Sequence, residues 1–591
     1  MISATERIYK AKRRHVEGDH LPTLFRNVRI SVVMPAYVVE SIAVIGSLAL
    51  VLILTHLAGL VTRWHSHDGR LGVPPGPKPL PLIGNLHQVV GKGLLWLQLH
   101  EWSKTYGPVM YLSFAGQPLV VLSTQDAALD LLSRRGAQYS DRPHQVVASE
   151  LVMKGKHLLL KQYDSECRLM QKLHAPLLNV AAANRYGPIQ DREVRQLLVD
   201  LLNSYDSSGE MGLEFSVPLE RTLFSIIHTL LYGYRFEAGQ EQELSNIRAS
   251  VDSLSRVVRL GEYLVDLVPV LNYLPRPLAP WKSEAEALYK HERDRHMENM
   301  DKGLANPGWN FSKQIHANNP DVQGLSAEDV AWGVGVLVDA TDTAGMTMQW
   351  FAVACALHGA RFVPQARQAL DTVVGKDRLP TLEDRPHLVY IDAIVNELLR
   401  WRPVVPDGMP HATKHEDTYQ GYRIPAGSVV VGNHWAITRD ESVFGPDTDS
   451  FVPERWLVDE NGDGRLTLKN LPLTGFGFGR RMCPGRHVAR GMLFLLVARL
   501  LWAFEIEAAV VTREKSNTSE QQRVEPVRMK IDDMEGFETF NFRPKCQRAV
   551  FRPRGPWVAE VVAKEQRDDN SDMVSLLNQA AVVGGDIDGK S

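Results

Sequence analysis

The chain has 591 residues and 44% of them are apolar, so it can bury a large core, and this composition argues against wholesale disorder. Its formal net charge of −3 gives no general electrostatic basis for binding nucleic acid. The four cysteines (Cys167, Cys355, Cys483 and Cys546) stand far apart without a CxxC pair, which argues against zinc ribbons and disulfide frameworks and favours a reduced, intracellular chain.

The first distinct element is an uncharged stretch over residues 42–61, IAVIGSLALVLILTHLAGLV, which is long enough to cross a bilayer. A cleaved signal peptide or a buried core helix is the alternative interpretation. The length argues against a signal sequence, and no A-x-A cleavage site follows. We therefore expect an N-terminal extension over residues 1–41 and an uncleaved transmembrane anchor over 42–61. If the chain starts at Met34, no basic residue precedes the span, and the positive-inside rule places the body in the cytosol.

A proline-rich hinge is predicted over residues 62–89, because five prolines in VPPGPKPLPLIGN stiffen the chain. One large domain over 90–555 follows, and a polar tail over 556–591 is expected to be loose. The fold class is mainly α with small β-sheets (α+β). The periodicity predicts strands over 108–114 and 118–123, and helices over 97–107, 326–360 and 487–504.

The segment FGFGRRMCPGRH, residues 476–487, surrounds Cys483 with glycines and arginines. Zinc would need further ligands at metal spacing, and none lies nearby. A nucleophilic cysteine would need a base, and His487 is a candidate. A thiolate held in a glycine-rich loop that approaches a flat partner suits haem iron, which accepts a single axial cysteine.

The pattern Phe476-x-x-Gly479-x-Arg481-x-Cys483-x-Gly485 resembles the haem-binding loop of the cytochrome P450 monooxygenases at every fixed position. The resemblance implies haem b as cofactor, with Cys483 as the axial iron ligand. It further implies that Phe476 packs near the thiolate and that Arg481 binds a haem propionate.

Two charged residues, Glu397 and Arg400, lie three apart in NELLR and share one face of a predicted helix. Taken alone, such a pair is more often a solvated surface pair. The family couples an ExxR helix to an arginine of a PxRW segment, here PERW with Arg455. The resemblance therefore implies a buried structural network of Glu397, Arg400 and Arg455 behind the haem.

The segment VDATDTAGM places Asp and Thr inside an apolar helix, where their side chains compete for backbone bonds. A helix with one wet face is the alternative. The segment resembles the family's oxygen-activation motif, so Asp342 and Thr343 are the expected catalytic residues. Asp339 and Ala340 replace the family's usual Ala and Gly, and Asp339 adds a carboxylate near the expected oxygen pocket.

A second departure concerns the expected propionate contacts. YDSECRLMQKLH resembles the helix that supplies a tryptophan and an arginine to one propionate, but Cys167 and Gln171 stand at those positions. His411, in GMPHATKHED, matches a propionate-binding histidine of many relatives. We therefore expect Arg481 and His411 to carry the propionate contacts.

The resemblance covers residues 74–555, and segment 410–440 is most similar to filamentous-fungal members of secondary metabolism. It implies a monooxygenase that inserts one atom of O2 into a lipophilic small molecule. The chain has no dinucleotide-binding motif, so we expect electrons from a separate NADPH–cytochrome P450 reductase, with cytochrome b5 as a further candidate partner. The expected location is the endoplasmic reticulum membrane, single-pass, with the catalytic domain in the cytosol. A haem-thiolate isomerase or dehydratase and a degenerate haem-binding scaffold are the alternatives.

Overall fold

The computed structural model describes residues 72–90, 94–237, 241–316, 322, 324–460, 462, 464–514, 524–538, 540–546, 548–569 and 571–581. They belong to one compact unit, His56–Ser591. The predicted extension over 1–41, the predicted anchor over 42–61 and the first part of the hinge lie outside these residues. Within the part of the chain described, no helix has the length and apolarity needed to span a membrane.

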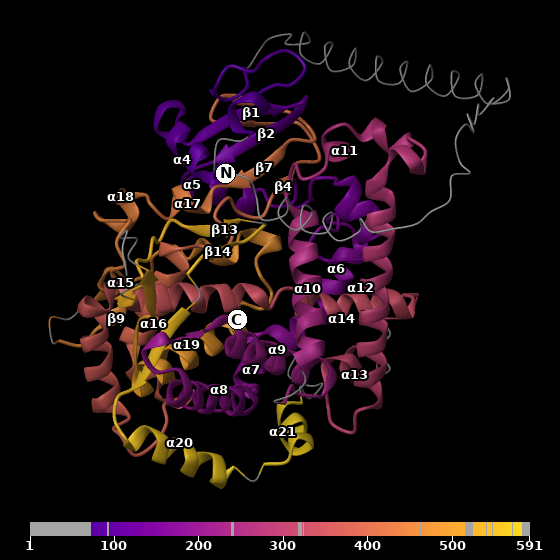
Figure 1. Cartoon of the computed structure of the whole chain (residues 1–591). Helices are drawn as coiled ribbons and strands as arrows, with labels where there is room; N and C mark the ends of the chain where they lie inside the picture. Colours follow the sequence, from indigo (N-terminus) through magenta and orange to yellow (C-terminus); the bar gives the residue numbers. More distant parts are fainter. Residues whose placement is uncertain are drawn as a thin grey trace, which may run out of the picture. The chain divides into compact units, whose positions relative to one another are not determined.

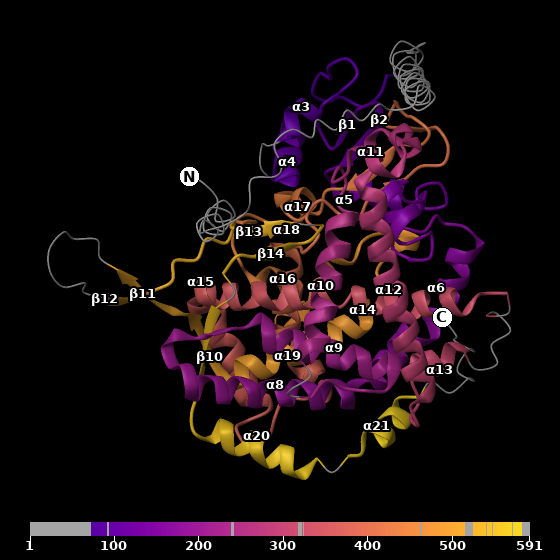
Figure 2. The same ribbon diagram turned by 45° about the vertical axis from the view of Figure 1, so that its right-hand side comes forward.

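Helices make up most of the body (Figures 1 and 2). Their bounds are α3 (Leu86–Val89), α4 (Leu95–Tyr106), α5 (Gln125–Ala128), α6 (Ser165–Leu178), α7 (Val180–Arg185), α8 (Gly187–Ser208), α9 (Ser216–Tyr232), α10 (Glu241–Val258), α11 (Leu264–Leu267), α12 (Pro280–Ala305), α13 (Phe311–His316), α14 (Ala327–Asp339), α15 (Asp342–Val373), α16 (Val389–Trp401), α17 (His434–Ile437), α18 (Glu441–Phe444), α19 (Arg486–Ala503), α20 (Trp557–Asp568) and α21 (Met573–Ala580).

The strands form small sheets at the flanks of the helical body. One sheet has the order β1-β2-β7-β4, in which only β2 and β7 pair in parallel. A second sheet has the order β10-β15-β3, and the remaining strands form hairpins. The bounds are β1 (Val109–Phe114), β2 (Gln117–Leu122), β3 (Leu213–Glu214), β4 (His411–Ala412), β5 (Asp417–Tyr419), β6 (Tyr422–Ile424), β7 (Val429–Gly432), β8 (Leu457–Val458), β9 (Thr467–Leu468), β10 (Phe504–Ala508), β11 (Val510–Glu514), β12 (Val524–Arg528), β13 (Gly536–Glu538), β14 (Phe542–Pro544) and β15 (Arg548–Pro553).

The main core lies where α15 and α19 contact each other and the neighbouring helices α8, α9 and α16. Helix α19 is the clearest case, because thirteen of its residues are buried and it touches several of these elements. Five fully buried tryptophans belong to this core: Trp96, Trp350, Trp401, Trp456 and Trp502. Helices α15 and α16, which carry Asp342 and Glu397, therefore belong to this packed core.

The predicted strands over 108–114 and 118–123 are confirmed as β1 and β2, and the helices over 97–107 and 487–504 as α4 and α19. The prediction of one continuous helix over 326–360 is wrong. The helix is interrupted after Asp339, and α15 begins at Asp342. The hydroxyls of Thr341 and Thr343 donate to the carbonyls of Leu337 and Ala340, and such side-chain bonds to the backbone bend helices.

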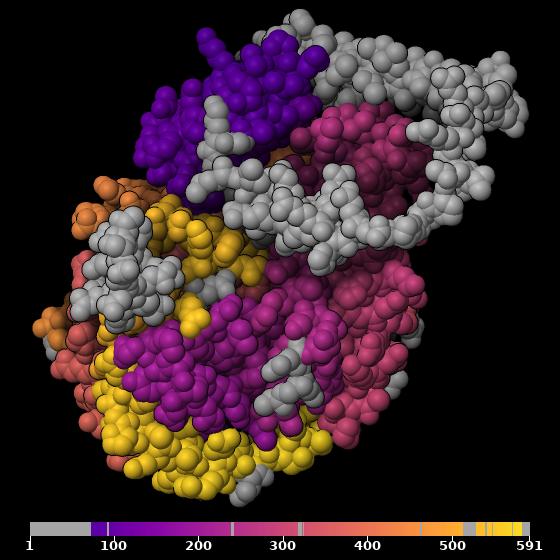
Figure 3. All heavy atoms as spheres, viewed as in Figure 1, coloured from indigo at the N-terminus to yellow at the C-terminus, as the bar shows by residue number. Residues whose placement is uncertain are grey.

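The expectation of a loose tail over 556–591 is wrong for residues 557–580, which form α20 and α21. Both helices pack against α8, and in Figure 3 the yellow C-terminal residues border the purple ones of the earlier helices. Helix α20 is amphipathic, although its second half, AKEQRD, is rich in charged residues. Val558, Val561 and Val562 recur at helical spacing and are buried, as is Leu577 of α21.

We predict that Leu577→Ala lowers the free energy of unfolding by about 2–5 kcal/mol, because it empties a fully buried site. Chemical denaturation followed by tryptophan fluorescence measures the change. Leu278→Ala is the matched control, since Leu278 is 62% exposed and its loss should change stability by about 0.5 kcal/mol or less. Equal effects of the two substitutions would show that α21 does not belong to the folded core.

Candidate functional site

The loop around Cys483 leads directly into α19. The Cys483 amide donates to the carbonyl of Phe476 at 2.8 Å, which closes the loop. Burial raises the pKa of the Cys483 thiol, whereas the amide N–H groups of Gly485 and Arg486 and the Arg486 guanidinium lower it. The sulfur therefore lies at a helix N-terminus with N–H groups directed at it, an arrangement that favours a thiolate.

Glycine is required in this loop at Gly479. Its φ is +55°, and a Cβ atom there would lie 2.2 Å from the carbonyl oxygen of Leu132. Gly485 is different, because its φ is ordinary and a Cβ atom would meet only the Cys483 sulfur, at 3.9 Å. Gly479 thus lets the loop approach the neighbouring segment, and Gly485 keeps the space beside the sulfur open.

Arg481 points away from the surface and into a buried pocket. Its Nη2 atom donates to the carbonyls of Leu158, Leu159 and Lys161 at 3.0–3.1 Å. Its Nη1 atom lies 2.9 Å from the Sγ atom of Cys167. Cys167 therefore contacts the arginine of the cysteine loop, at the position where the family has tryptophan.

A second guanidinium, Arg142, shares this pocket, and the sequence analysis missed it. Its Nε atom donates to the carbonyl of Leu159 at 3.0 Å, the same carbonyl that Arg481 contacts. Its Nη1 atom donates to Pro410 O, next to His411, whose Nδ1 atom lies 2.7 Å from Tyr139 O. Only the Arg-Pro dipeptide between apolar segments marks Arg142 in the sequence, which is a weak signal.

The pocket of Arg142, Arg481 and His411 suits an anion. Neither guanidinium forms an ion pair with a carboxylate of the described residues, although Arg142 is only 4% exposed. Burial and the neighbouring Arg481 lower the pKa of Arg142, and burial and Arg142 lower the pKa of His411. Two buried positive charges that repel each other need a negative partner. Haem propionates supply such a partner, so the residues present fit haem.

Gln171 does not contribute a second cation to this pocket. Its side chain is near the surface, and its Nε2 atom donates to the carbonyl of Arg480 at 2.9 Å. It therefore braces the cysteine loop from α6. The second guanidinium of the pocket belongs to Arg142, on the segment before α6.

Glu397 and Arg400 are fully buried on α16 and lie in contact. The carboxylate of Glu397 accepts bonds from Arg400 Nε and Nη2, both at 2.7 Å. It also accepts bonds from Arg455 Nε at 3.1 Å, Trp456 Nε1 at 2.9 Å and the Val452 amide at 2.8 Å. The structure thus brings together Glu397, Arg400 and Arg455, and it ties α16 to the segment that precedes the cysteine loop.

The interruption between α14 and α15 carries the expected catalytic residues. The Thr343 hydroxyl donates to the carbonyl of Ala340 at 2.9 Å. Ala340 is exposed although Val338 and Thr341 on either side are buried, so the interruption faces open space. Asp342 is 7% exposed, and burial raises its pKa to about 6 although Arg543 and Arg248 lower it.

Asp339 does not project into open space as a free carboxylate. Its Oδ1 atom accepts a bond from Arg295 Nη2 of α12 at 2.7 Å, and its side chain is 7% exposed. Burial raises the pKa of Asp339, but Arg295 and the neighbouring histidines hold it below the ordinary value. The two aspartates of this segment therefore have opposite environments.

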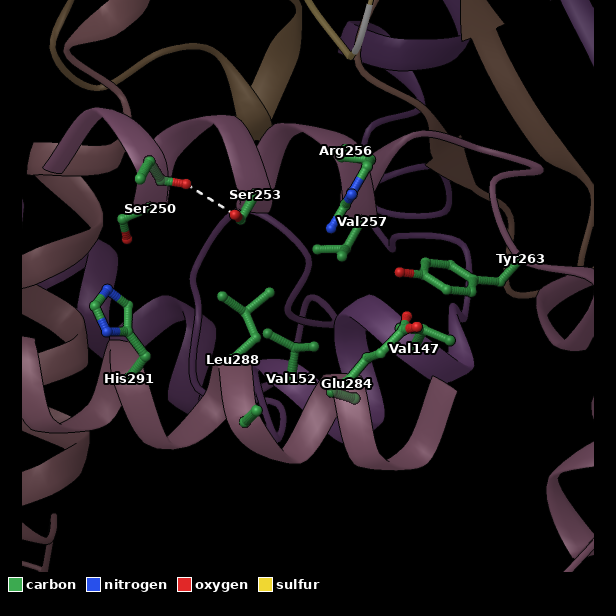
Figure 4. A pocket seen from close by; sticks show the side chains of 13 residues that line it. Val147, Val152, Ser250, Ser253, Arg256, Val257, Tyr263, Glu284, Leu288 and His291 are labelled. Carbon is green, nitrogen blue, oxygen red and sulfur yellow. Dashed lines mark hydrogen bonds between the residues drawn. The ribbon is translucent and has the colours of Figure 1, made fainter. Parts of the chain in front are cut away.

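A cavity of about 300 Å³ lies between α10, α12 and the segment of residues 146–152 (Figure 4). Val147, Val152, Val257 and Leu288 form apolar walls, and Figure 4 shows Arg256, Glu284 and Tyr263 gathered at one end of it. Ser250 and His291 lie at the other end, so polar and apolar side chains both line the cavity.

Comparison with known proteins gives a consistent result. The sequence profile of Cytochrome P450 matches residues 74–530. "Cytochrome P450 monooxygenase aneD" of Aspergillus aculeatus is 33% identical over 536 residues, which cover 90% of this chain and 98% of that protein. "Cytochrome P450 monooxygenase drtD" of Aspergillus calidoustus is 38% identical over 442 residues, covering 74% and 80%. "Cytochrome P450 monooxygenase peniB" of Penicillium patulum is 35% identical over 443 residues, covering 75% and 80%.

The matched region contains the cysteine loop, the Glu397 network and the interrupted helix with Asp342 and Thr343. The resemblance noted from the motifs is confirmed by a match over most of the chain. The chain belongs to the cytochrome P450 family and is a haem-thiolate monooxygenase.

Proposed function

We propose that the protein inserts one atom of O2 into a lipophilic small molecule of fungal secondary metabolism, with electrons from a separate NADPH–cytochrome P450 reductase. The observation that carries the proposal is the Cys483 loop, whose amides point at a half-buried thiol beside a pocket with two guanidinium groups. The names and fungal origin of the relatives support the class of substrate.

When bound through its iron to Cys483, haem supplies the centre at which dioxygen is reduced and one oxygen atom is transferred. The residues of the chain bind the haem and supply protons. Arg142 and Arg481 would neutralise the propionates, and the N–H groups of Gly485 and Arg486 would tune the basicity of the sulfur. The Thr343 hydroxyl, which donates to Ala340 O at the interruption of the distal helix (α14 and α15), would supply a proton, and the carboxyl of the preceding residue Asp342 would replace it.

The face that carries the cysteine loop suits the reductase. Arg480 is exposed and its guanidinium lies 5.7 Å from the Tyr163 ring, which Arg168 also approaches, at 5.9 Å. Arg486 is half-buried and donates to the carbonyl of Cys483 at 3.1 Å. A positive surface of this kind favours an acidic partner such as the reductase or cytochrome b5.

We further propose a single-pass endoplasmic reticulum protein, anchored by residues 42–61, with the catalytic domain in the cytosol. Exposed apolar side chains support a membrane contact of the body: Leu260, Leu264, Tyr273 and Leu278 between α10 and α12, and Leu80, Leu82 and Ile83 near the hinge. In both ribbon views α11 and the indigo N-terminal loops lie at the same end of the body. Sedimentation with microsomes that survives carbonate but is lost on deletion of residues 1–61 checks this location.

The test of the function uses the full chain reconstituted with an NADPH-dependent reductase. We expect the reduced, CO-bound protein to show the red-shifted Soret band of a cysteine thiolate, and Cys483→Ser to lose it. We also expect Thr343→Ala to retain the band but to divert NADPH electrons to hydrogen peroxide. NADPH consumption that does not depend on the reductase would contradict the proposal and favour an isomerase or dehydratase, and complete inertness toward NADPH would favour a scaffold.

We predict that Arg142→Ala and Arg481→Ala each accelerate haem loss by about tenfold or more, because each removes a charge-assisted bond to a propionate. Transfer of haem to apomyoglobin measures the rate on protein that still has its CO band. Arg480→Ala is the matched control, since Arg480 is a neighbouring exposed arginine. If Arg142→Ala and Arg480→Ala lose haem equally slowly, Arg142 does not hold a propionate.

We predict that Asp342→Asn stabilises the protein in a pH-dependent way. The pKa of Asp342 is raised by burial to about 6 in the folded protein, against about 3.9 in an unfolded chain. Folding therefore loses stability as the pH rises from about 4 to about 6, and the loss of about 3 kcal/mol persists above that range. The asparagine variant should lack this loss, so its advantage in denaturant unfolding should be near zero at pH 4 and full at pH 7. An advantage that is independent of pH would contradict this assignment.

A further inference from the structure

A buried ionic cluster lies where α14 ends. It consists of Asp339, the last residue of α14, of Glu292, Arg295 and His296 on α12, and of His157 on the segment before α6. We call these five residues the Asp339 cluster. Glu292 and His296 are completely buried, and the side chains of Asp339 and His157 are 7% and 4% exposed.

Arg295 is the bridge within the cluster. Its Nη2 atom donates to Glu292 Oε2 at 2.6 Å and to Asp339 Oδ1 at 2.7 Å. The other oxygen of Glu292 accepts a bond from the Ser250 hydroxyl of α10, and Ser250 lines the cavity of Figure 4. A continuous polar chain therefore runs from the cavity wall through α12 to the distal helix.

Several polar atoms of the cluster have no hydrogen-bond partner among the described residues. They are Asp339 Oδ2, Arg295 Nη1, His157 Nε2, both ring nitrogens of His296 and, beside them, Trp332 Nε1. His157 Nε2 and His296 Nε2 lie 3.4 and 3.9 Å from Asp339 Oδ2, and the rings of His296 and Trp332 are 4.6 Å apart. The unpartnered atoms thus converge on one small region.

Leaving such atoms unpaired costs about 1–3 kcal/mol for each one, so a folded protein does not keep several together without a partner. Buried water is the usual partner, and one molecule serves two to four polar atoms. Gly335 supports a built site, because a Cβ atom there would lie 1.9 Å from His296 Nδ1. Only glycine lets this imidazole approach α14.

The charges of the Asp339 cluster also favour bound water. Two carboxylates, Asp339 and Glu292, share the single guanidinium of Arg295. Burial and Arg295 lower the pKa of His296 well below its usual value, so this ring does not balance the charge. Further polar neighbours are His228 and Tyr232 of α9, Ser250 of α10 and His291 of α12, and burial lowers the pKa of His228 to about 3. Ordered water would solvate the two carboxylates and the unpartnered ring nitrogens together.

We propose that the Asp339 cluster binds ordered water and that Asp339 is a positioning residue for the monooxygenase reaction, because it ties the interruption of the distal helix to α12. A carboxylate at a helix C-terminus is opposed by the helix dipole, so Asp339 holds its place through Arg295. Ala340 follows it directly and accepts the Thr343 hydroxyl bond. The position of Thr343 therefore depends on the bond between Asp339 and Arg295.

A crystal structure of the full-length holoenzyme tests the water site directly. The expected result is at least one ordered water within hydrogen-bond distance of Asp339 Oδ2 and of an imidazole of the cluster. A cluster without water, in which the side chains bond directly to one another, would overturn the proposal.

The positioning role is tested with Asp339→Asn, which keeps the shape and removes the charge. We expect the dithionite-reduced holoenzyme to return to the ferric state about 2- to 30-fold faster after mixing with dioxygen. The rate does not depend on how much protein is folded, so a merely structural effect would leave it unchanged. Asp339→Glu should restore a slower rate.

Two further variants complete the design. Glu193→Gln removes an equally buried carboxylate that pairs with Arg221 and Arg235 away from the distal helix, and it should keep the wild-type rate. Asp339→Ala combined with Arg295→Leu and Glu292→Gln removes the three charges of the cluster together, so no buried charge loses its partner, and it should fold yet still be fast. A wild-type rate in Asp339→Asn, or in this triple variant, would refute the positioning role.

Discussion

Glu397 is fully buried, and its carboxylate is the point at which two segments far apart in the sequence meet. Arg400 approaches it from the same helix, Arg455 and Trp456 from the 3-10 turn at 453–456, and the amide comes from Val452 directly before that turn. Removing one partner of a buried charge network costs about 3–5 kcal/mol, because the remaining charge stays buried. The segment that carries Arg455 leads into the cysteine loop, so the position of Cys483 depends on this carboxylate.

The pocket beside the cysteine loop has an unusual arrangement of charges. Cys167 is small, which leaves room for the Arg481 guanidinium to lie against its sulfur. Arg142 and Arg481 both donate to the carbonyl of Leu159. The two positive charges that a propionate needs are thus both present. One of them, Arg142, comes from a segment outside the cysteine-loop motif.

The distal helix places two aspartates three residues apart and gives them opposite properties. Arg295 lowers the pKa of Asp339, whereas burial raises that of Asp342 to about 6. Asp339 is thereby suited to fixed electrostatic anchoring, and Asp342 to giving and taking a proton near neutral pH. A division of labour between neighbouring carboxyl groups follows from what each side chain packs against, because their intrinsic acidity is the same.

The residues that carry the chemistry were readable along the chain. The cysteine loop, NELLR, PERW and the Asp-Thr pair are local patterns, since each depends on residues a few positions apart, and strands β1 and β2 and helix α19 followed from periodicity. Arg142 and the Arg295 partner of Asp339 were not readable, because each meets its neighbours across a separation that no local pattern records. The helical tail was missed because its charged residues outnumber the valines that are buried only when α8 is beside them. Tertiary packing therefore decided the charge state and the partner of each site residue, since burial and distance, rather than residue type, determine both.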